Sequence, residues 1–191
     1  MHRIEAYIIL SMIIFAIMTI LYLPMFFVLK RKGKGFIRQV SYVICLWSLS
    51  VPVFAAIFFV IPITFKPELY ILNLMPLAWA GEGHISRRIL TEIIPNVLMF
   101  APLGFSIPVV FVKMREIYMV AWIAFLLSLG IEFFQYFIGR SADIDDLLAN
   151  IMGAVVGYCI YILFNYLLKN RAWWEKFTHP TKENIAYENS R

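Results

Sequence analysis

The sequence predicts an all-α integral membrane protein, a polytopic helical bundle of about five transmembrane helices with the N-terminus outside and the C-terminus inside. Apolar residues make up 62% of the 191-residue chain and charged residues only 15%, against roughly 45–50% and about 25% in soluble domains. The apolar residues also fall in long runs without charges. One core of this size cannot hide so much apolar surface from water, which excludes a water-soluble monomer.

Five runs are long enough to cross a bilayer, which takes about 20 helical residues. They cover residues 6–29, 39–65, 93–112, 117–138 and 147–168, and the fourth contains a single charge, Glu132. The first run is too long for a signal-peptide core and shows no clear cleavage site, so we expect it to be retained. No run has the alternation that a β-barrel strand needs. We expect one membrane domain over residues 1–191.

The distribution of Lys and Arg predicts the orientation, because cytoplasmic loops are enriched in both. Twelve of the 17 lie in segments 30–38, 113–115 and 169–191, and five lie at positions 3, 66, 87, 88 and 140. With the N-terminus outside, the larger group is cytoplasmic and includes the tail over 169–191. The net charge of +5 then reflects topology, and no nucleic-acid partner is expected. The expected location is a cell membrane, crossed several times.

Polar residues recur at helical spacing near the outer ends of three predicted helices. Residues three and four apart share one helix face. Because these ends lie on the same side of the membrane, we expect their polar faces to meet. The faces consist of Glu92 and Asn96 on the third helix, Ser128, Glu132, Gln135 and Gly139 on the fourth, and Asp143, Asp146, Asn150, Gly153 and Gly157 on the fifth.

These faces predict a polar pocket that opens toward the outer leaflet. Ionisable side chains within a membrane are costly, so Glu132 is a functional candidate by default. The connection over 66–92 borders the pocket, and two interpretations of it stay open: a segment in or re-entering the membrane, or an exposed loop. The predicted ligand-binding residues are Arg87, Asn96, Glu132, Gln135, Arg140, Asp143, Asp146 and Asn150; His84 and Arg88 lie near them.

Structural roles compete with binding at each of these positions. Asp143 is placed to cap the fifth helix, with Asp146 favouring its dipole. The glycines at 153 and 157 suit close helix packing, and the asparagines at 96 and 150 suit hydrogen bonds between helices. The alternative role for Glu132 is a buried partner of Arg140 or Arg87.

A cofactor is not expected from the sequence. Asp143, Asp145 and Asp146 are hard oxygen ligands that would suit a divalent cation such as Mg²⁺ or Ca²⁺. However, Asp145 points away from the other two on a helix, and the chain has no metal-ligand spacing motif. It also lacks a nucleophile elbow, a phosphate-cradling glycine loop and a dinucleotide fingerprint. The two cysteines, Cys45 and Cys159, lie within apolar runs and suit packing.

Four blocks of the chain are distinctive: 72–77 (LNLMPL), 96–105 (NVLMFAPLGF), 128–135 (SLGIEFFQ) and 143–146 (DIDD), the last followed by Asn150 and Gly153. Together they resemble the VanZ-like family of bacterial membrane proteins, over about residues 70–165. The first helix and the tail lie outside this resemblance. It implies a location in the bacterial cytoplasmic membrane and a link to resistance against teicoplanin, a lipoglycopeptide that anchors in the membrane, and it leaves the reaction or binding event open.

Two functions follow as hypotheses. In the first, which we favour, the protein is not an enzyme, and its outer pocket binds a membrane lipid, a lipid-linked cell-wall precursor or the lipoglycopeptide. In the second, it is an intramembrane enzyme that hydrolyses or transfers groups on a lipid-linked intermediate. There Glu132 would be the general base and Asp143 and Asp146 would assist. A transporter is a weaker third option, because five helices show no internal symmetry.

Overall fold

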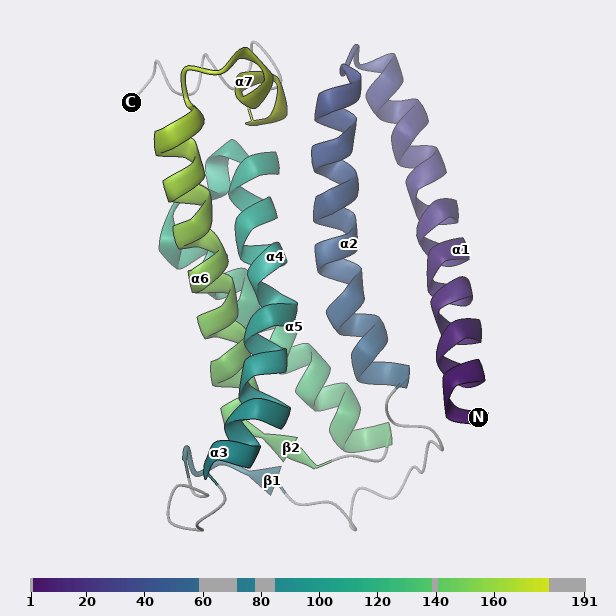
Figure 1. The fold of residues 1–191 in the computed structure, drawn as a ribbon, viewed down its shortest axis with the longest axis vertical. Helices are drawn as coiled ribbons and strands as arrows, with labels where there is room; N and C mark the ends of the chain where they lie inside the picture. The colour runs from purple at the N-terminus through teal and green to yellow at the C-terminus, as the bar shows by residue number, and fades with distance from the viewer. Residues whose placement is uncertain (1, 59–71, 78–84, 139–140, 179–191) are drawn as a thin grey trace.

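A computed structural model describes residues 2–58, 72–77, 85–138 and 141–178. Its long helices are α1 (His2–Arg31), α2 (Phe36–Phe58), α4 (Ile94–Val110), α5 (Ile117–Ile138) and α6 (Ile144–Leu168). Successive long helices run in opposite directions, and α1 packs on the outside of the bundle against α2 (Figure 1). The predicted all-α membrane bundle is confirmed.

Four helices in the described part of the chain are long and apolar enough to cross a membrane. These segments are Phe36–Ala56, Ile89–Val110, Ile117–Phe137 and Ile144–Leu168. The first predicted run coincides with α1, some of whose side chains lie outside the described residues. Most exposed large side chains of the described helices are apolar, including Phe27, Trp122, Phe133 and Leu163, which is the expected surface of a protein in lipid.

Four of the five helices begin earlier than the predicted runs, and the third and fifth of them do so at the end that carries the predicted site residues. The third predicted helix was expected at residue 93, but helical backbone starts in α3 (Ile85–Arg88) and continues through the π-helical turn η3 (Ile89–Ile93). Charge does not end this helix because Arg88 and Glu92 pair along it. The helix expected from residue 147 begins at Ile144, after the cap Asp143. The second predicted run extends to 65, and residues 59–65 lie outside the described chain.

The helices α4 and α6 form the closest pair in the bundle. A Cβ atom on Gly104 would lie 1.9 Å from the carbonyl oxygen of Ala154, and one on Gly157 would lie 1.9 Å from that of Ala101. Only glycine permits this backbone approach. The small-residue face predicted for α6 is therefore the packing seam. Beside it lies an apolar core that includes Phe100 and Leu103 of α4 with Val120 and Ala124 of α5.

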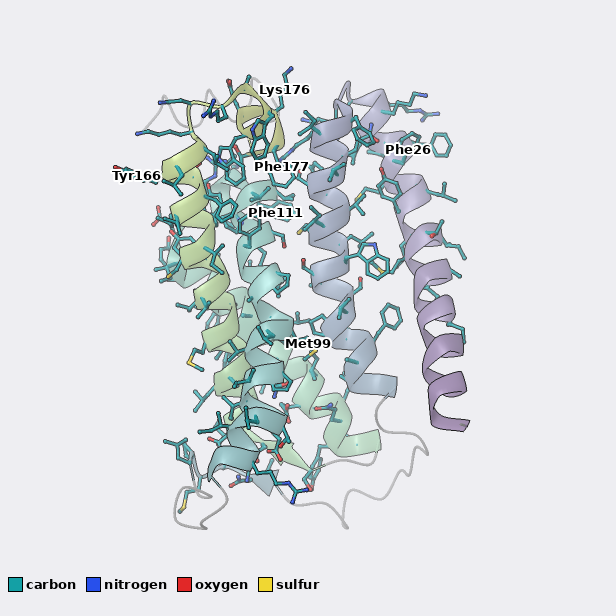
Figure 2. The ribbon with its side chains drawn as sticks, in the orientation of Figure 1. Phe26, Met99, Phe111, Tyr166, Lys176 and Phe177 are labelled. Atoms are coloured by element: carbon teal, nitrogen blue, oxygen red, sulfur yellow. The ribbon has the colours of Figure 1, made fainter. Side chains whose placement is uncertain are left out.

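One end of the bundle, which we call the α7 end, is closed by α7 (Ala172–Thr178), which lies across the tops of the long helices (Figure 1). Its Trp174 and Thr178 are buried, and the Trp174 indole nitrogen donates to Asn165 Oδ1 at 3.1 Å. Figure 2 shows Phe177 directed from α7 toward the bundle, whereas Lys176 points outward. The tail is thus docked over 172–178, which its composition alone did not indicate.

Two arginines tie α7 to the end of α4. Arg38, only 3% exposed, donates to the carbonyl oxygens of Val109 at 2.8 Å, Val110 at 2.6 Å and Phe177. Arg115 follows the short 3₁₀ turn η4 (Val112–Met114) and donates to the carbonyls of Pro108 and Thr178, both at 3.1 Å. The last carbonyls of a helix have no partner within it. The two guanidinium groups supply that partner.

The opposite end, which we call the site end, carries a short parallel strand pair, β1 (Leu72–Asn73) and β2 (Ala142–Asp143). The strands lie beneath the starts of α4 and α6 (Figure 1). This end also holds α3, η3 and the last turn of α5. Every helix that carries a predicted site residue therefore begins or ends here.

Candidate functional site

Pairing of β1 with β2 sets Asn73 opposite Asp143, and Asp143 is the centre of the hydrogen-bond network at the site end. Its Oδ1 accepts from the backbone N–H of Asp145 at 2.9 Å, the N-cap bond of α6. The same oxygen accepts from Asn73 Nδ2 at 3.2 Å. The backbone N–H of Asp143 donates to Glu132 Oε2 at 3.1 Å. Asp143 thus caps α6 and connects β1, α5 and α6 at once.

Arg88 is the basic residue of this network. Its guanidinium pairs with the Asp143 carboxylate, and its Nε lies 2.9 Å from Glu92 Oε2. Partial burial alone would lower the pKa of Arg88, but the carboxylates of Glu92 and Asp143 outweigh burial and raise the pKa above its usual value. Its neighbour Arg87, which was the predicted ligand, is exposed. The guanidinium at the site is therefore that of Arg88.

Residues 73–77 fold over the start of α6. Asn73 Oδ1 accepts from the backbone N–H of Met75 at 3.3 Å, which forms a local turn. The backbone N–H of Leu77 donates to the buried Asp145 at 2.9 Å. Leu77 has φ of 56°, in the left-handed region that disfavours side chains such as leucine. The bond to Asp145 holds this strained turn in place.

Two asparagines join helices deeper in the bundle. Asn96 Nδ2 of α4 donates to Asp146 Oδ1 of α6 at 2.7 Å. Asn150 Nδ2 of α6 donates to Ser128 Oγ of α5 at 2.8 Å. Asn150 is only 2% exposed, and its Oδ1 has no hydrogen-bond partner among the described residues. A buried acceptor without a donor is costly and rare in native proteins, so this oxygen calls for a partner such as a water molecule or a ligand.

A cavity of about 410 Å³ lies between α2, α4, α5 and α6 at the site end. Its polar lining comes from three of these helices and from η3, and its apolar lining includes Met99, which lies between α4 and α2 in Figure 2. Both the volume and the mixture of a few polar groups with apolar walls are typical of small-molecule sites. The lining residues are Pro52, Ala55, Ala56, Thr91, Pro95, Asn96, Met99, Ile131, Glu132, Gln135, Asp146 and Asn150.

A second cavity, an apolar groove of about 350 Å³, borders Glu132 from the other side. Its walls come from the strand pair, the last turns of α5 and the start of α6. Phe133 and Phe137 are exposed within it. The groove is lined by Leu72, Asn73, Leu74, Leu129, Glu132, Phe133, Tyr136, Phe137, Ala142, Asp143, Ile144 and Leu147. Glu132 and Asp143 are therefore close to an apolar surface as well as a polar one.

The structure brings most of the predicted site residues to the site end and divides them between two places. Five line the polar cavity, and Asp143 belongs to the neighbouring network with Arg88. Arg140 and His84 lie outside the described residues, as do 66–71 and 78–84 of the predicted loop. The described parts of that connection are 72–77, which is the β1 turn at the site end, and 85–92, which is helical in α3 and η3. The five cavity residues are Asn96, Glu132, Gln135, Asp146 and Asn150.

The alternative structural roles are also visible in these contacts. Asp143 caps α6, and both asparagines bond across helices. Glu132 accepts from the backbone N–H of Asp143, and its expected pairing with Arg140 stays a prediction because Arg140 lies outside the described residues. The acidic residues 143, 145 and 146 each meet a different donor. No group of three or more His, Cys, Asp or Glu side chains that could hold a metal occurs in the described segments. Catalytic roles for Glu132, Asp143 and Asp146 stay a prediction.

Sequence reasoning missed three contributors to the site end: Asn73, Leu77 and Arg88 as the paired arginine. Asn73 and Leu77 lie in one of the blocks that carry the family resemblance, which was the available signal. Their contacts depend on pairing of β1 with a strand seventy residues away. Periodicity within one helix does not contain that information.

A comparison with models of protein families identifies the family of this chain. The profile of the VanZ/LLP1 family matches residues 6–165, which takes in α1 and α2 as well as the residues on which the resemblance rested. Comparisons with curated proteins and with solved structures find no match. The match covers most of the chain and includes every described residue of both cavities, and so the protein belongs to the VanZ/LLP1 family.

Proposed function

We propose that this membrane protein binds an amphiphile at the site end, with the polar head in the cavity between α2, α4, α5 and α6. The amphiphile is a membrane lipid, a lipid-linked cell-wall precursor or a lipoglycopeptide, and binding affects the sensitivity of the cell to teicoplanin. The observation that carries the proposal is the cavity itself. It is large, it contains two carboxylates and three amides, and it includes Asn150, whose buried Oδ1 lacks a partner among the described residues.

The apolar groove beside Glu132 supports an amphiphile over a purely polar solute. Its walls are formed mainly by leucine and aromatic side chains of α5, α6 and β1. Such a surface suits an acyl or prenyl chain, because apolar chains gain about 0.8 kcal/mol per buried methylene when they leave water. A polar cavity and an apolar groove that meet at one residue match a molecule with a head and a tail.

We propose further that the site end faces the outside of the bacterial cytoplasmic membrane. The α7 end carries most of the described basic residues, including Lys30, Arg31, Lys113 and Lys169, whereas Arg87 and Arg88 lie at the site end. Basic residues favour the cytoplasmic side. In this orientation the cavity is reached from the outer leaflet, where lipid-linked precursors and lipoglycopeptides meet.

The test uses the full chain expressed in a bacterium whose own copy is deleted. Glu132→Gln and Asp146→Asn remove one cavity charge each and keep the shape of the side chain. We expect both to abolish the effect of the protein on teicoplanin sensitivity, while vancomycin sensitivity and protein level stay unchanged. The control is Glu175→Gln, the same change at an exposed position of α7. It should behave like the wild type. Full retention of the effect by both cavity variants would contradict the proposal.

A further inference from the structure

The composition of the polar cavity selects the chemistry of the head that enters it. Its charged groups are the carboxylates of Glu132 and Asp146, and no Lys or Arg is among the described residues that line it. The nearest described guanidinium, Arg88, is paired with Asp143 and Glu92 outside the cavity. A phosphate placed here would meet two like charges in surroundings that screen them poorly. The cavity therefore disfavours anionic heads.

A bare cation also fits the cavity poorly. Asn96, Gln135 and Asn150 present amide N–H donors as well as carbonyl acceptors, and an ammonium group or metal ion has no use for donors. Asp146 accepts from Asn96 and Glu132 accepts from the Asp143 backbone, so part of their acceptor capacity is used. The three amide nitrogens also donate once each within the protein, to Asp146, Ser128 and the Ala56 carbonyl, which leaves one N–H on each amide. What remains is a mixed set of donors and acceptors.

A sugar matches a mixed set, because each hydroxyl both donates and accepts. The carbonyl oxygen of Asn150, buried and without a partner among the described residues, is one acceptor for such a hydroxyl. The apolar walls supplied by Met99, Ile131 and Pro95 suit the C–H faces of a sugar ring. Thr91 and Pro95 line the cavity and are exposed, so the ring can enter past them.

We propose that the group bound in this cavity is an uncharged sugar carried on a lipid and that phosphate heads are excluded. This rests on the proposed function and narrows its ligand to a glycosylated amphiphile. Glu132 and Asp146 act as acceptors for sugar hydroxyls and as the source of the exclusion. Asn150 and Gln135 orient the ring by hydrogen bonds.

The experiment is a competition between two lipids with identical tails. The purified full chain, in a detergent without a sugar head, is incubated with equimolar monoglucosyl-dioleoylglycerol and dioleoylphosphatidylglycerol, and retained lipid is counted by native mass spectrometry. Because the tails match, the groove contributes equally to both. We expect the glucolipid to be retained about tenfold more than the anionic lipid. Asp146→Asn should lower this ratio severalfold, and Glu175→Gln should leave it unchanged.

Two further variants separate failure of this inference from failure of the proposed function. Asn150→Ala should weaken glucolipid retention roughly tenfold, and Gln135→Ala provides the same test if the first variant misfolds. Equal or greater retention of phosphatidylglycerol, still reduced by these variants, would overturn the sugar inference and leave amphiphile binding intact. Retention of both lipids that no cavity variant alters would overturn both.

Discussion

The two ends of the bundle bury charged side chains for different purposes. At the α7 end, Arg38 and Arg115 donate to backbone carbonyls at the ends of α4 and α7. At the site end, Arg88 and Asp143 bond mainly to other side chains from separate segments. Backbone partners are fixed by the helices, whereas side-chain partners can exchange. The contacts at the α7 end are thus set by helix backbones, and those at the site end by side chains of separate segments, which is the arrangement that the proposed binding role requires.

The cavity is a further difference between the two ends. At the α7 end the carbonyls that a helix terminus leaves free find a guanidinium, although the buried Nε of Arg38 has no hydrogen-bond partner among the described residues. At the site end a cavity of about 410 Å³ remains, and Asn150 Oδ1 has no partner among the described residues. Stability alone would favour filling such a cavity. The proposed binding role would explain why this cavity is kept at the site end.

The largest expected effect is the loss of the arginine tie at the α7 end. Arg38→Met should lower the free energy of unfolding by about 4 kcal/mol, because the buried carbonyls of Val109 and Val110 and the partly buried carbonyl of Phe177 lose their donor together. Denaturant unfolding in micelles measures this. Arg31→Met, an exposed arginine at the same end, should change it by less than about 0.5 kcal/mol. Equal losses for the two variants would show that Arg38 is not a structural tie.

The next largest effect is expected where α4 and α6 pack closely through their glycines. Gly104→Ala should destabilise the protein by about 3 kcal/mol, because its Cβ would lie 1.9 Å from the Ala154 carbonyl oxygen and α4 must move away. Gly130→Ala, on α5 with open space around the added carbon, should be neutral or slightly stabilising. If Gly104→Ala is tolerated as well as Gly130→Ala, the close α4–α6 approach is wrong.

The smallest effect on stability is expected at the site end. Asp143→Ala removes the α6 cap and the partner of Arg88, and should cost about 2 kcal/mol. Asp143→Asn keeps a capping oxygen and should cost about half as much. Hydrogen exchange at residues 73–77 should become faster in Asp143→Ala, which loses the oxygen that accepts from Asn73, and less so in Asp143→Asn, which keeps it. Unchanged exchange would mean that Asp143 does not hold this segment.

The polar helix faces could be predicted from the sequence, because they depend only on the spacing of residues within one helix. Glu132 and Gln135 share a face of α5, and Asp146, Asn150 and Gly157 share one of α6, as the spacing predicts. We could also expect these polar faces to meet, because the helix ends that carry them lie on the same side of the membrane. The Asn96–Asp146 bond and the glycine seam are direct consequences of those two regularities.

Contacts between segments far apart in the chain could not be predicted from helical periodicity. Arg38 looked like an ordinary cytoplasmic charge, and only the tertiary fold places it against the end of α4. Arg88 replaces Arg87 because the phase of a short helix that runs into a π-helical turn cannot be derived from spacing. The groove beside Glu132 depends on β1 reaching β2, which no single segment encodes.

A structure of the full chain, isolated with its native lipids in nanodiscs, tests the central claim most directly. We predict non-protein density in the cavity between α2, α4, α5 and α6, with a donor atom within hydrogen-bond distance of Asn150 Oδ1 and a second contact to Asp146. A cavity closed by protein side chains, with Asn150 Oδ1 bonded to another residue, would contradict a binding role for this end of the bundle.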